Sequence, residues 1–259
     1  MFVSTKNICE HTFVPRFINA DSIVIDLGAN DGEFSHGIIE RFGCRVISAE
    51  PLNELCDQID RHPLLHLLNT AVGGKNQNVT MNVFSERCAS VFEPVTAEEP
   101  LRERTVPMVT LAEFRRLASV DHVDLLKIDI EGAEIDLFGS CSDSELKEIG
   151  QITVEFHSFI YADQHHSVLQ VLERMADIGF WVIPFRLDYS DVLFVNRSTG
   201  ISASEIAYLR TFVKYSRAIM RRLRRVASSV GLLDDPNGYC KTTAGRASGP
   251  RLGKANSPR

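Results

Sequence analysis

The sequence predicts an α/β protein built on one open, doubly wound sheet of about seven strands. Two observations carry this prediction. The chain has 259 residues, of which 44% are hydrophobic, and this is enough apolar material for the core of one large domain. From residue 21 onward, short β-branched or aliphatic runs alternate with segments of helical character, which is the pattern of parallel βα units.

Seven short apolar runs are the expected strands. Most of them are bounded by turn residues such as Gly, Asn and Asp. They occupy residues 23–27, 45–50, 64–72, 123–130, 151–157, 181–185 and 191–195. The last two strands are expected to pair in antiparallel fashion. Residues 78–109 show only a pattern of short strands or loops.

Helices are expected between these strands. They occupy residues 33–42, 53–61, 133 to about 139, and 164–178, and a short helix starts near residue 110. Segment 164–178 carries apolar residues at helical spacing. Thr110 and Glu113 have the spacing of a capping box, so Thr110 is the expected N-cap of the short helix.

Composition and charge divide the chain into four parts. These are an N-terminal extension (1–20), the main domain (21–200), a basic amphipathic helix (201–233) and a basic tail that we expect to be disordered (234–259). Residues 205–259 carry a net charge of +9, whereas the first 204 residues carry −15. An acidic body argues against extended contact with a phosphate backbone, so no nucleic-acid partner is expected.

The chain has no features of a membrane-spanning or secreted protein. No apolar run approaches the roughly 18 residues needed to cross a bilayer, and the first residues lack the basic-then-apolar pattern of a signal peptide. Its six cysteines include no CxxC pair, which argues against a zinc ribbon and against a disulfide framework. We therefore expect a cytoplasmic protein with reduced thiols.

A glycine loop follows the first expected strand. Gly28 and Gly32 lie between a strand and a helix, where the backbone can approach a ligand closely and helix amides point outward. A dinucleotide fingerprint needs glycines at the third and sixth positions from Gly28, but this sequence has Asn30 and Glu33 there. A nicotinamide-dependent oxidoreductase is therefore disfavoured.

The acidic residues near this loop favour a cationic cofactor. S-adenosylmethionine carries a sulfonium and no phosphate, so carboxylates such as Asp26 and Asp31 would attract it. Glu50 ends the second strand about twenty residues after the loop, where a carboxylate can accept hydrogen bonds from both ribose hydroxyls. The plainer alternative is a tight turn followed by a solvated glutamate.

A second cluster of charged residues follows two later strands. Lys127, Asp129, Glu131 and Glu134 lie at the carboxyl end of one strand, and Glu155 and His157 at the end of the next. That edge faces the ligand crevice of an open α/β sheet. We expect Lys127 to neutralise a neighbouring acid, because an unpaired buried ammonium is costly.

The cluster allows several kinds of chemistry. His157 could act as a general base, since its ordinary pKa lies near neutrality, although a hydrogen-bonded structural histidine is an equally good alternative. Asp129, Glu131, Glu155 and His157 could also hold a divalent cation. They lack an ordered ligand spacing in the sequence, so no metal is expected.

These residues carry a family resemblance. The segments VIDLGANDGEFS, Glu50-Pro51, NTAVGG, VTLAEF, DLLKIDIEGAEIDLF and VEFH resemble, in order and rough spacing, those of the FkbM-type S-adenosylmethionine-dependent methyltransferases. The resemblance covers about residues 21–196. It implies a Rossmann-like class I methyltransferase fold that methylates a hydroxyl, often on a sugar, a glycolipid or another small natural product.

The resemblance also implies roles for single residues. Asp129, Glu131 and His157 would line the reaction centre. The remaining implied residues bind S-adenosylmethionine: Asp26, Gly28, Asn30 and Gly32 form the loop, Glu50 holds the ribose, and Asn69 and Ala71 lie near the adenine. The basic region after residue 200 has no counterpart in the family.

The expected function is therefore S-adenosylmethionine-dependent O-methylation of a small-molecule or glycan acceptor. The alternative is a non-catalytic S-adenosylmethionine-binding module that acts through its basic C-terminal helix on a membrane surface or a partner protein. Peripheral membrane contact would then involve residues 205–226. Docking of this helix on the acidic body is the simpler explanation for its charge.

Overall fold

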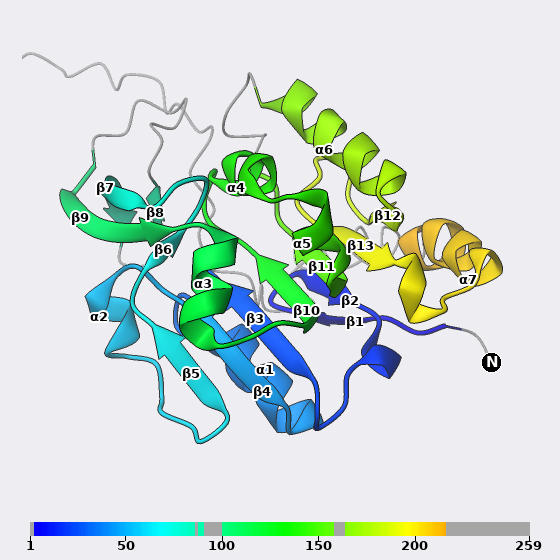
Figure 1. The fold of residues 1–259 in the computed structure, drawn as a ribbon, viewed down its shortest axis with the longest axis horizontal. Coiled ribbons are helices and arrows are strands. Elements are labelled where there is room, and N and C mark those ends of the chain that lie inside the picture. The colour runs from blue at the N-terminus through cyan, green and yellow to red at the C-terminus, as the bar shows by residue number, and fades with distance from the viewer. Residues whose placement is uncertain (1–2, 86–87, 91–99, 158–163, 216–259) are drawn as a thin grey trace, which may run out of the picture.

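A seven-stranded sheet forms the centre of the protein, as the computed structural model in Figure 1 shows. The structure describes residues 3–85, 88–90, 100–157 and 164–215. The sheet order is β12-β13-β11-β10-β3-β4-β5, and only the pairs made by β13 are antiparallel. The strands are β3 (Ile23–Leu27), β4 (Arg45–Ala49), β5 (Leu65–Leu68), β10 (Val123–Ile128), β11 (Ile149–Val154), β12 (Phe180–Pro184) and β13 (Val192–Asn196). The predicted doubly wound sheet of seven strands with an antiparallel final pair is confirmed.

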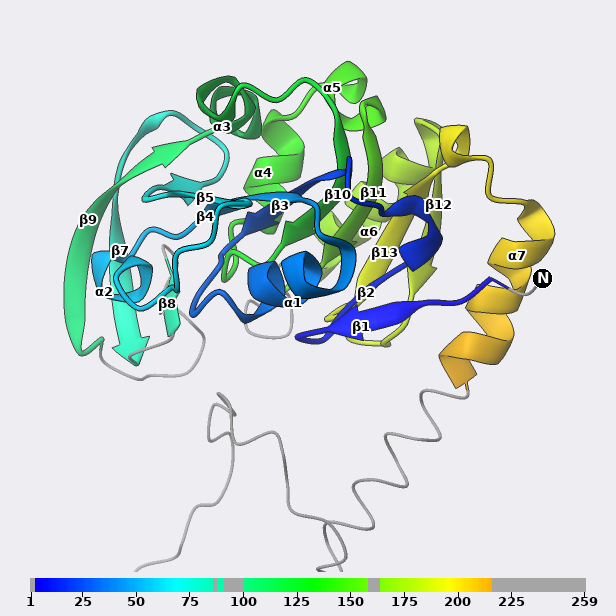
Figure 2. The same cartoon turned by 90° about the horizontal axis from the view of Figure 1, so that it is seen from below.

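Helices cover both faces of this sheet, as Figure 2 shows for α1 on one side and for α3 and α4 on the other. Alternate strand residues face opposite sides. Ile25 of β3 therefore packs into the core with Phe114 of α3 and Leu137 of α4, whereas Val24 packs with Phe34 of α1. The helices are α1 (Glu33–Phe42), α2 (Asn53–Cys56), α3 (Leu111–Ala118), α4 (Glu134–Ser140), α5 (Asp143–Lys147), α6 (His165–Asp177) and α7 (Ala203–Tyr208). Thr110 caps α3 as predicted, since its hydroxyl accepts a hydrogen bond from the Glu113 amide.

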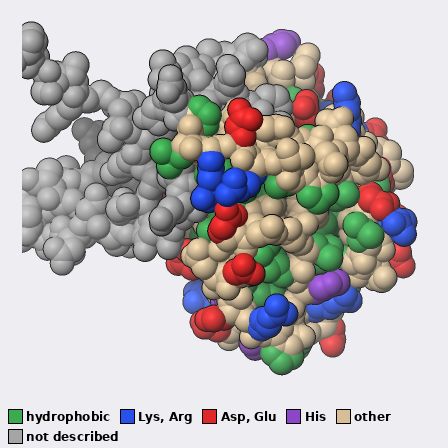
Figure 3. Space-filling view, turned by 90° about the vertical axis from the view of Figure 1, so that its left-hand side faces the viewer, with side chains coloured by type: hydrophobic (Ala, Val, Ile, Leu, Met, Phe, Trp, Pro, Cys, Tyr) green, Lys and Arg blue, Asp and Glu red, His purple; other side chains and the backbone are tan. Residues whose placement is uncertain are grey.

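A second sheet, of order β6-β9-β7-β8, lies beside the β5 edge of the main sheet. Its strands are β6 (Ala71–Val72), β7 (Gln77–Ser85), β8 (Cys88–Ser90) and β9 (Arg102–Val109). The sequence indicated only short strands or loops here, but β7 and β9 pair along most of their lengths. Acidic and basic side chains are interspersed on the visible part of this side of the molecule (Figure 3).

Two element predictions were wrong in extent. The expected strand 64–72 ends at Leu68, because Ala71 and Val72 leave the main sheet and pair with Met108 and Val109 of β9. The expected helix 53–61 stops at Cys56. Helix α5 was not expected, although Ser142 and Glu145 form a capping box at its start.

The strands also end earlier than their apolar runs suggested. β4 ends at Ala49, β10 at Ile128 and β11 at Val154. Glu50, Asp129 and residues 155–157 therefore belong to loops beyond the carboxyl ends of the strands. Loops at this edge can aim side chains at a ligand, which the alternating geometry of a strand would not allow.

Residues 3–20 are packed against the main sheet. Strands β1 (Lys6–Ile8) and β2 (His11–Phe13) form a hairpin whose turn residues Cys9 and Glu10 both adopt left-handed backbone conformations. The Thr12 hydroxyl donates to Asp191 Oδ2 at 2.7 Å. The Gln151 side chain exchanges two hydrogen bonds with the backbone of Val14. The extension is therefore tied to β11 and to the chain just before β13.

The described part of the basic C-terminal helix docks on the body. α7 starts at the capping box of Ser202 and Glu205 and continues into a π-helical turn over Leu209–Val213. Ile206 and Leu209 are buried against the outer strands. Residues 216–233 and the tail 234–259 lie outside the described residues. Among the described residues, no helix is long and apolar enough to cross a membrane.

The contact between Thr12 and Asp191 should stabilise the docked hairpin. We expect Thr12→Val to lower the free energy of unfolding by about 1–3 kcal/mol, because it removes a buried donor to a carboxylate at nearly constant volume. Urea denaturation at neutral pH measures this change. An unchanged unfolding midpoint would show that this hydroxyl contact contributes nothing to stability.

Candidate active site

A cleft opens at the carboxyl ends of β3, β4 and β10. One wall comes from the main sheet and its loops, and the other from Met81 and Met108 of the second sheet. Leu52 and Leu55 add apolar side chains to its lining. The predicted site residues that line the cleft are Gly28, Asn30, Glu50, Ala71, Asp129 and Glu131.

The glycine loop wraps tightly around the end of the main sheet. Gly28 has φ +78°, and a Cβ atom there would lie 1.8 Å from the carbonyl oxygen of Asp129. Only glycine fits this close approach of two backbones. Gly32, at φ +82°, precedes α1, so the loop and the helix N-terminus form one continuous turn.

Glu50 is fixed by backbone amides of two segments. Its Oε2 accepts from the Asn30 amide and its Oε1 from the Leu52 amide, both at 2.9 Å. Burial raises the pKa of Glu50 to about 7, even though the two hydrogen bonds oppose that change. A carboxylate has about four acceptor sites, so two remain for ligand hydroxyls.

Asn69 lies behind the cleft. Its side-chain amide donates to the carbonyl oxygens of Glu50 at 3.0 Å and Pro51 at 3.2 Å. Asn69 therefore braces the Glu-Pro segment, and its neighbour Ala71 is the residue that lines the cleft.

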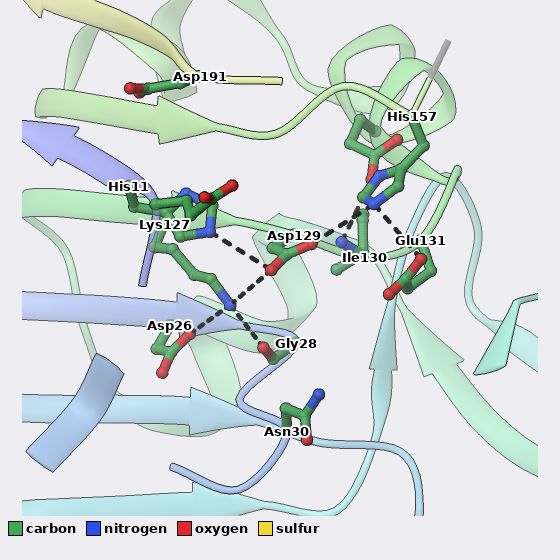
Figure 4. A network of polar contacts seen from close by, with 12 residues as sticks. His11, Asp26, Gly28, Asn30, Lys127, Asp129, Ile130, Glu131, His157 and Asp191 are labelled. Carbon is green, nitrogen blue, oxygen red and sulfur yellow. Dashed lines mark hydrogen bonds and ion pairs between the residues drawn. The ribbon is translucent and has the colours of Figure 1, made fainter. Parts of the chain in front are cut away.

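Lys127 joins the glycine loop to the charged residues that follow β10 and β11, as Figure 4 shows. These residues are called the acidic edge: Asp129, Glu131, Glu134, Glu155 and His157. Its ammonium donates to the carbonyl oxygen of Gly28 at 2.5 Å, and lies 3.1 Å from Asp26 Oδ1 and 3.5 Å from Asp129 Oδ2. Burial alone would lower the pKa of Lys127, but the two carboxylates raise it above its ordinary value. Asp26 is fully buried and also accepts from the Ser35 hydroxyl at 2.6 Å. Asp26 thus holds Lys127, and it does not line the cleft.

His157 lies among three carboxylates. Its Nδ1 is 2.9 Å from Glu134 Oε1, while its Nε2 is 3.3 Å from Glu131 Oε2 and 3.8 Å from Asp129 Oδ1. Burial alone would lower the pKa of His157, but the ion pairs with Glu134 and Glu131 raise it well above the ordinary value. Both ring nitrogens therefore already face carboxylates.

The carboxyl groups of the acidic edge differ in their pKa values. Burial opposes ionisation of Asp129, but Lys127 and His11 lower its pKa below the ordinary range. Burial raises the pKa of Glu131 to about 7, and that of Glu155 to about 8. The backbone of Glu131 has φ +52°, an uncommon conformation for a residue with a side chain. The Ser90 hydroxyl holds the Glu131 carbonyl oxygen at 2.7 Å.

Sequence reasoning missed one residue of this site. His11 of the N-terminal hairpin places its Nε2 3.3 Å from Asp129 Oδ2, a contact across 118 positions that no local pattern signals. Glu134 was expected in the charged cluster but was given no role of its own. It accepts hydrogen bonds from the amides of Ile130 and Gly132 in addition to its contact with His157.

Lys127 should stabilise the fold as well as the site. We expect Lys127→Met to lower the free energy of unfolding by about 3–5 kcal/mol, because it leaves the buried charge of Asp26 unpaired. The double variant Lys127→Met, Asp26→Asn should recover more than half of that loss. Urea denaturation of the three proteins tests this, and equal stability of the single and double variants would contradict the pairing.

Solved structures with similarity to this chain include methyltransferases. TrmK from M. capricolum, solved with S-adenosyl-homocysteine, is 7% identical with a TM-score of 0.39, over 86% of this chain and 86% of that chain. Precorrin-6y C5,15-methyltransferase from Geobacter metallireducens GS-15 is 12% identical with a TM-score of 0.37, over 69% and 80%. These similarities are weak, so the assignment rests on the family match below.

The family match covers the whole candidate site except His11. Residues 26–180, more than half of the chain, match the family described as the methyltransferase FkbM domain. A search of curated proteins finds no match. The matched range contains the glycine loop, Glu50 and the acidic edge, in the order that the sequence predicted. The chain therefore belongs to the FkbM family of methyltransferases, and S-adenosylmethionine is its cofactor.

Proposed function

We propose that this methyltransferase transfers the methyl group to a hydroxyl oxygen of a sugar, a glycolipid or another small natural product. One observation carries the proposal. The carboxylates of Asp129 and Glu131 line the same cleft as Gly28 and Glu50. The hydroxyl that accepts the methyl group and the cofactor would therefore share one cavity. Carboxylates hold hydroxyl groups by accepting their hydrogen bonds, and they accept a proton when the oxygen is alkylated.

The cofactor would lie along this cleft in one direction. Glu50 would accept hydrogen bonds from the ribose hydroxyls, and the apolar side chains of Leu52 and Leu55 would contact the adenine. The sulfonium would then face Asp129 and Glu131, whose negative charge attracts it. This orientation brings the transferable methyl group to the acidic edge.

The reaction is an in-line displacement. A lone pair of the acceptor oxygen forms the new C–O bond, while the C–S bond breaks and its electron pair stays on sulfur, giving S-adenosyl-homocysteine. The hydroxyl proton leaves the acceptor oxygen. Holding acceptor and methyl group in line supplies most of the rate, because the two reactants no longer have to meet by diffusion.

The proton has two kinds of acceptor at this edge. We predicted His157 from the sequence and Asp129 as the second choice. The geometry favours a carboxylate, because both ring nitrogens of His157 already face Glu134 and Glu131. In this proposal Glu131, whose pKa is raised to about 7, receives the proton, and His157 holds Glu131 in place. Asp129 stays ionised, because Lys127 and His11 lower its pKa, and it holds the acceptor hydroxyl by accepting its hydrogen bond.

The alternative function, a binding module acting through the basic helix, has less support among the described residues. α7 buries Ile206 and Leu209 against the body, which favours docking. Phe212 and Tyr215 are 63% and 64% exposed at the end of the described chain. Binding of the full chain to anionic vesicles, compared with a chain ending at residue 215, tests this alternative.

Cofactor binding should depend on Glu50 and on pH. With a pKa of about 7, Glu50 is ionised above neutrality, and only the ionised form accepts hydrogen bonds from both ribose hydroxyls. We expect the affinity for S-adenosylmethionine to rise about tenfold from pH 6 to pH 8, as the carboxylate loses its proton. In Glu50→Gln the affinity should be at least about tenfold lower at pH 8, and this pH dependence should disappear.

Isothermal titration at both pH values measures these effects. NADH serves as the negative control for the cofactor class. Equal affinities of wild type and Glu50→Gln at pH 8 would remove Glu50 from the cofactor site.

Methyl transfer should depend on Asp129. Screening radiolabelled S-adenosylmethionine against a panel of glycans and hydroxylated natural products identifies an acceptor. With that acceptor, Asp129→Asn should lose about 100-fold in turnover, the scale expected when the acceptor hydroxyl is no longer held in line with the methyl group. Glu103→Gln, an exposed site on β9, is the matched control. Unchanged turnover in Asp129→Asn would contradict the role assigned to Asp129.

A further inference from the structure

The acidic edge holds more negative than positive charge. Among the described residues of this region, Lys127 is the lysine that neutralises carboxylates, and it forms ion pairs with both Asp26 and Asp129. Buried carboxylates need a partner, because the solvation lost on burial must be replaced. The carboxylates that converge around Lys127 and His157 are Asp26, Asp129, Glu131, Glu134 and Glu155.

We propose that Asp129, Glu131 and His157 bind one divalent metal ion at the mouth of the cofactor cleft. These residues each offer one ligand atom, and the three atoms lie within 4.8 Å of one another. The donors are two carboxylate oxygens and one imidazole nitrogen, a set that suits Mn²⁺, Fe²⁺ or Zn²⁺. Lys127 occupies the Oδ2 side of Asp129, which leaves Oδ1 on the side of His157.

The spacing of the donors fits an ion between them. His157 Nε2 is 3.3 Å from Glu131 Oε2 and 3.8 Å from Asp129 Oδ1. With metal–ligand bonds of about 2.1 Å, two ligands lie about 3.0 Å apart at right angles and about 3.4 Å apart in a tetrahedron. The two separations from His157 Nε2 are therefore within about 1 Å of the values that a shared ion requires.

The other nitrogen of His157 is held in the way that metal-binding histidines are held. Nδ1 lies 2.9 Å from Oε1 of Glu134, a fully buried carboxylate that is itself fixed by the amides of Ile130 and Gly132. A carboxylate at Nδ1 fixes the orientation of the ring, and the metal would displace the proton of Nε2 when it binds. Glu134 lies outside the three proposed ligands, so it supports the site independently.

A second histidine strengthens the case from the other side of Asp129. His11 is 1% exposed, and its Nδ1 is buried without a hydrogen-bond partner among the described residues. His11, Asp129 and Glu155 also place one ligand atom each within 4.8 Å of one another. Asp129 is thus flanked on both sides by an imidazole and a glutamate, which a purely structural ion pair does not need.

The location gives the ion a role that rests on the proposed function. Asp129 and Glu131 both line the cleft, so the ion would lie beside the acceptor oxygen. A divalent cation lowers the pKa of a hydroxyl that binds to it, as it does for bound water. With Asp129 and Glu131 bound to the ion, the acceptor hydroxyl would pass its proton to solvent water as the new C–O bond forms and the C–S bond breaks.

The test measures metal binding directly and needs no acceptor. Purified full-length protein is freed of metal with a chelator and dialysed against Mn²⁺, with Zn²⁺ and Mg²⁺ in parallel, and bound metal is counted by elemental analysis. We expect one ion per chain. Asp129→Asn and Glu131→Gln should each weaken binding at least tenfold, and Glu103→Gln should not.

A spectroscopic measurement identifies the histidine. Spin-echo measurements on the Mn²⁺ complex should show coupling to a histidine nitrogen, and His157→Gln should remove it. Circular dichroism confirms that each variant is folded, and the partly exposed Glu131 keeps the test valid if another variant is not.

Two results would overturn the metal site: no ion bound at millimolar Mn²⁺, Zn²⁺ or Mg²⁺, or full binding in both Asp129→Asn and Glu131→Gln. Titration of the same samples with S-adenosylmethionine separates this failure from that of the proposed function. Cofactor binding without an ion removes only the metal, whereas ion binding without cofactor binding removes only the placement of the cofactor.

Discussion

The ion pairs of Lys127 are the constraint on which the rest of the site depends. A buried ammonium is tolerated only with charged partners, and here Asp26 comes from β3 while Asp129 follows β10. The same ammonium holds the carbonyl oxygen of Gly28. One side chain therefore fixes the cofactor loop and the acidic edge at a set distance. The register of the sheet makes this possible, since Lys127 pairs directly with Asp26 across the parallel strands.

A second constraint is backbone contact at the same edge. The amide of Asp129 donates to the carbonyl oxygen of Leu27, and Gly28 has no room for a side chain beside Asp129. The turn at Glu131 then leaves the sheet in a left-handed conformation and is closed by the buried carboxylate of Glu134. Unfavourable backbone geometry of this kind persists where the surroundings enforce it, and it is common at functional sites.

Much of the fold could be predicted from the sequence because its signals are local. The seven strands, the glycine loop and the clustering of Asp129 with His157 follow from apolar runs and from the common edge of parallel strands. The split between β5 and β6 could not be predicted, because it depends on the pairing of Ala71 with distant Met108. His11 was missed for the same reason. Its partner lies 118 positions away, and a lone histidine near the N-terminus carries no pattern.

The docked N-terminal hairpin also sets the order of events during synthesis. Thr12 bonds to Asp191, and Val14 to Gln151, across separations of 179 and 137 residues. At ribosomal rates of about 5–20 residues per second, the hairpin waits roughly nine to thirty-six seconds for its last partner. Asp129, the partner of His11, is made before Asp191, but the hairpin that carries His11 can dock fully only when nearly the whole domain has left the ribosome. The hairpin is thus made early and finds its place late, and contacts of such long range slow folding.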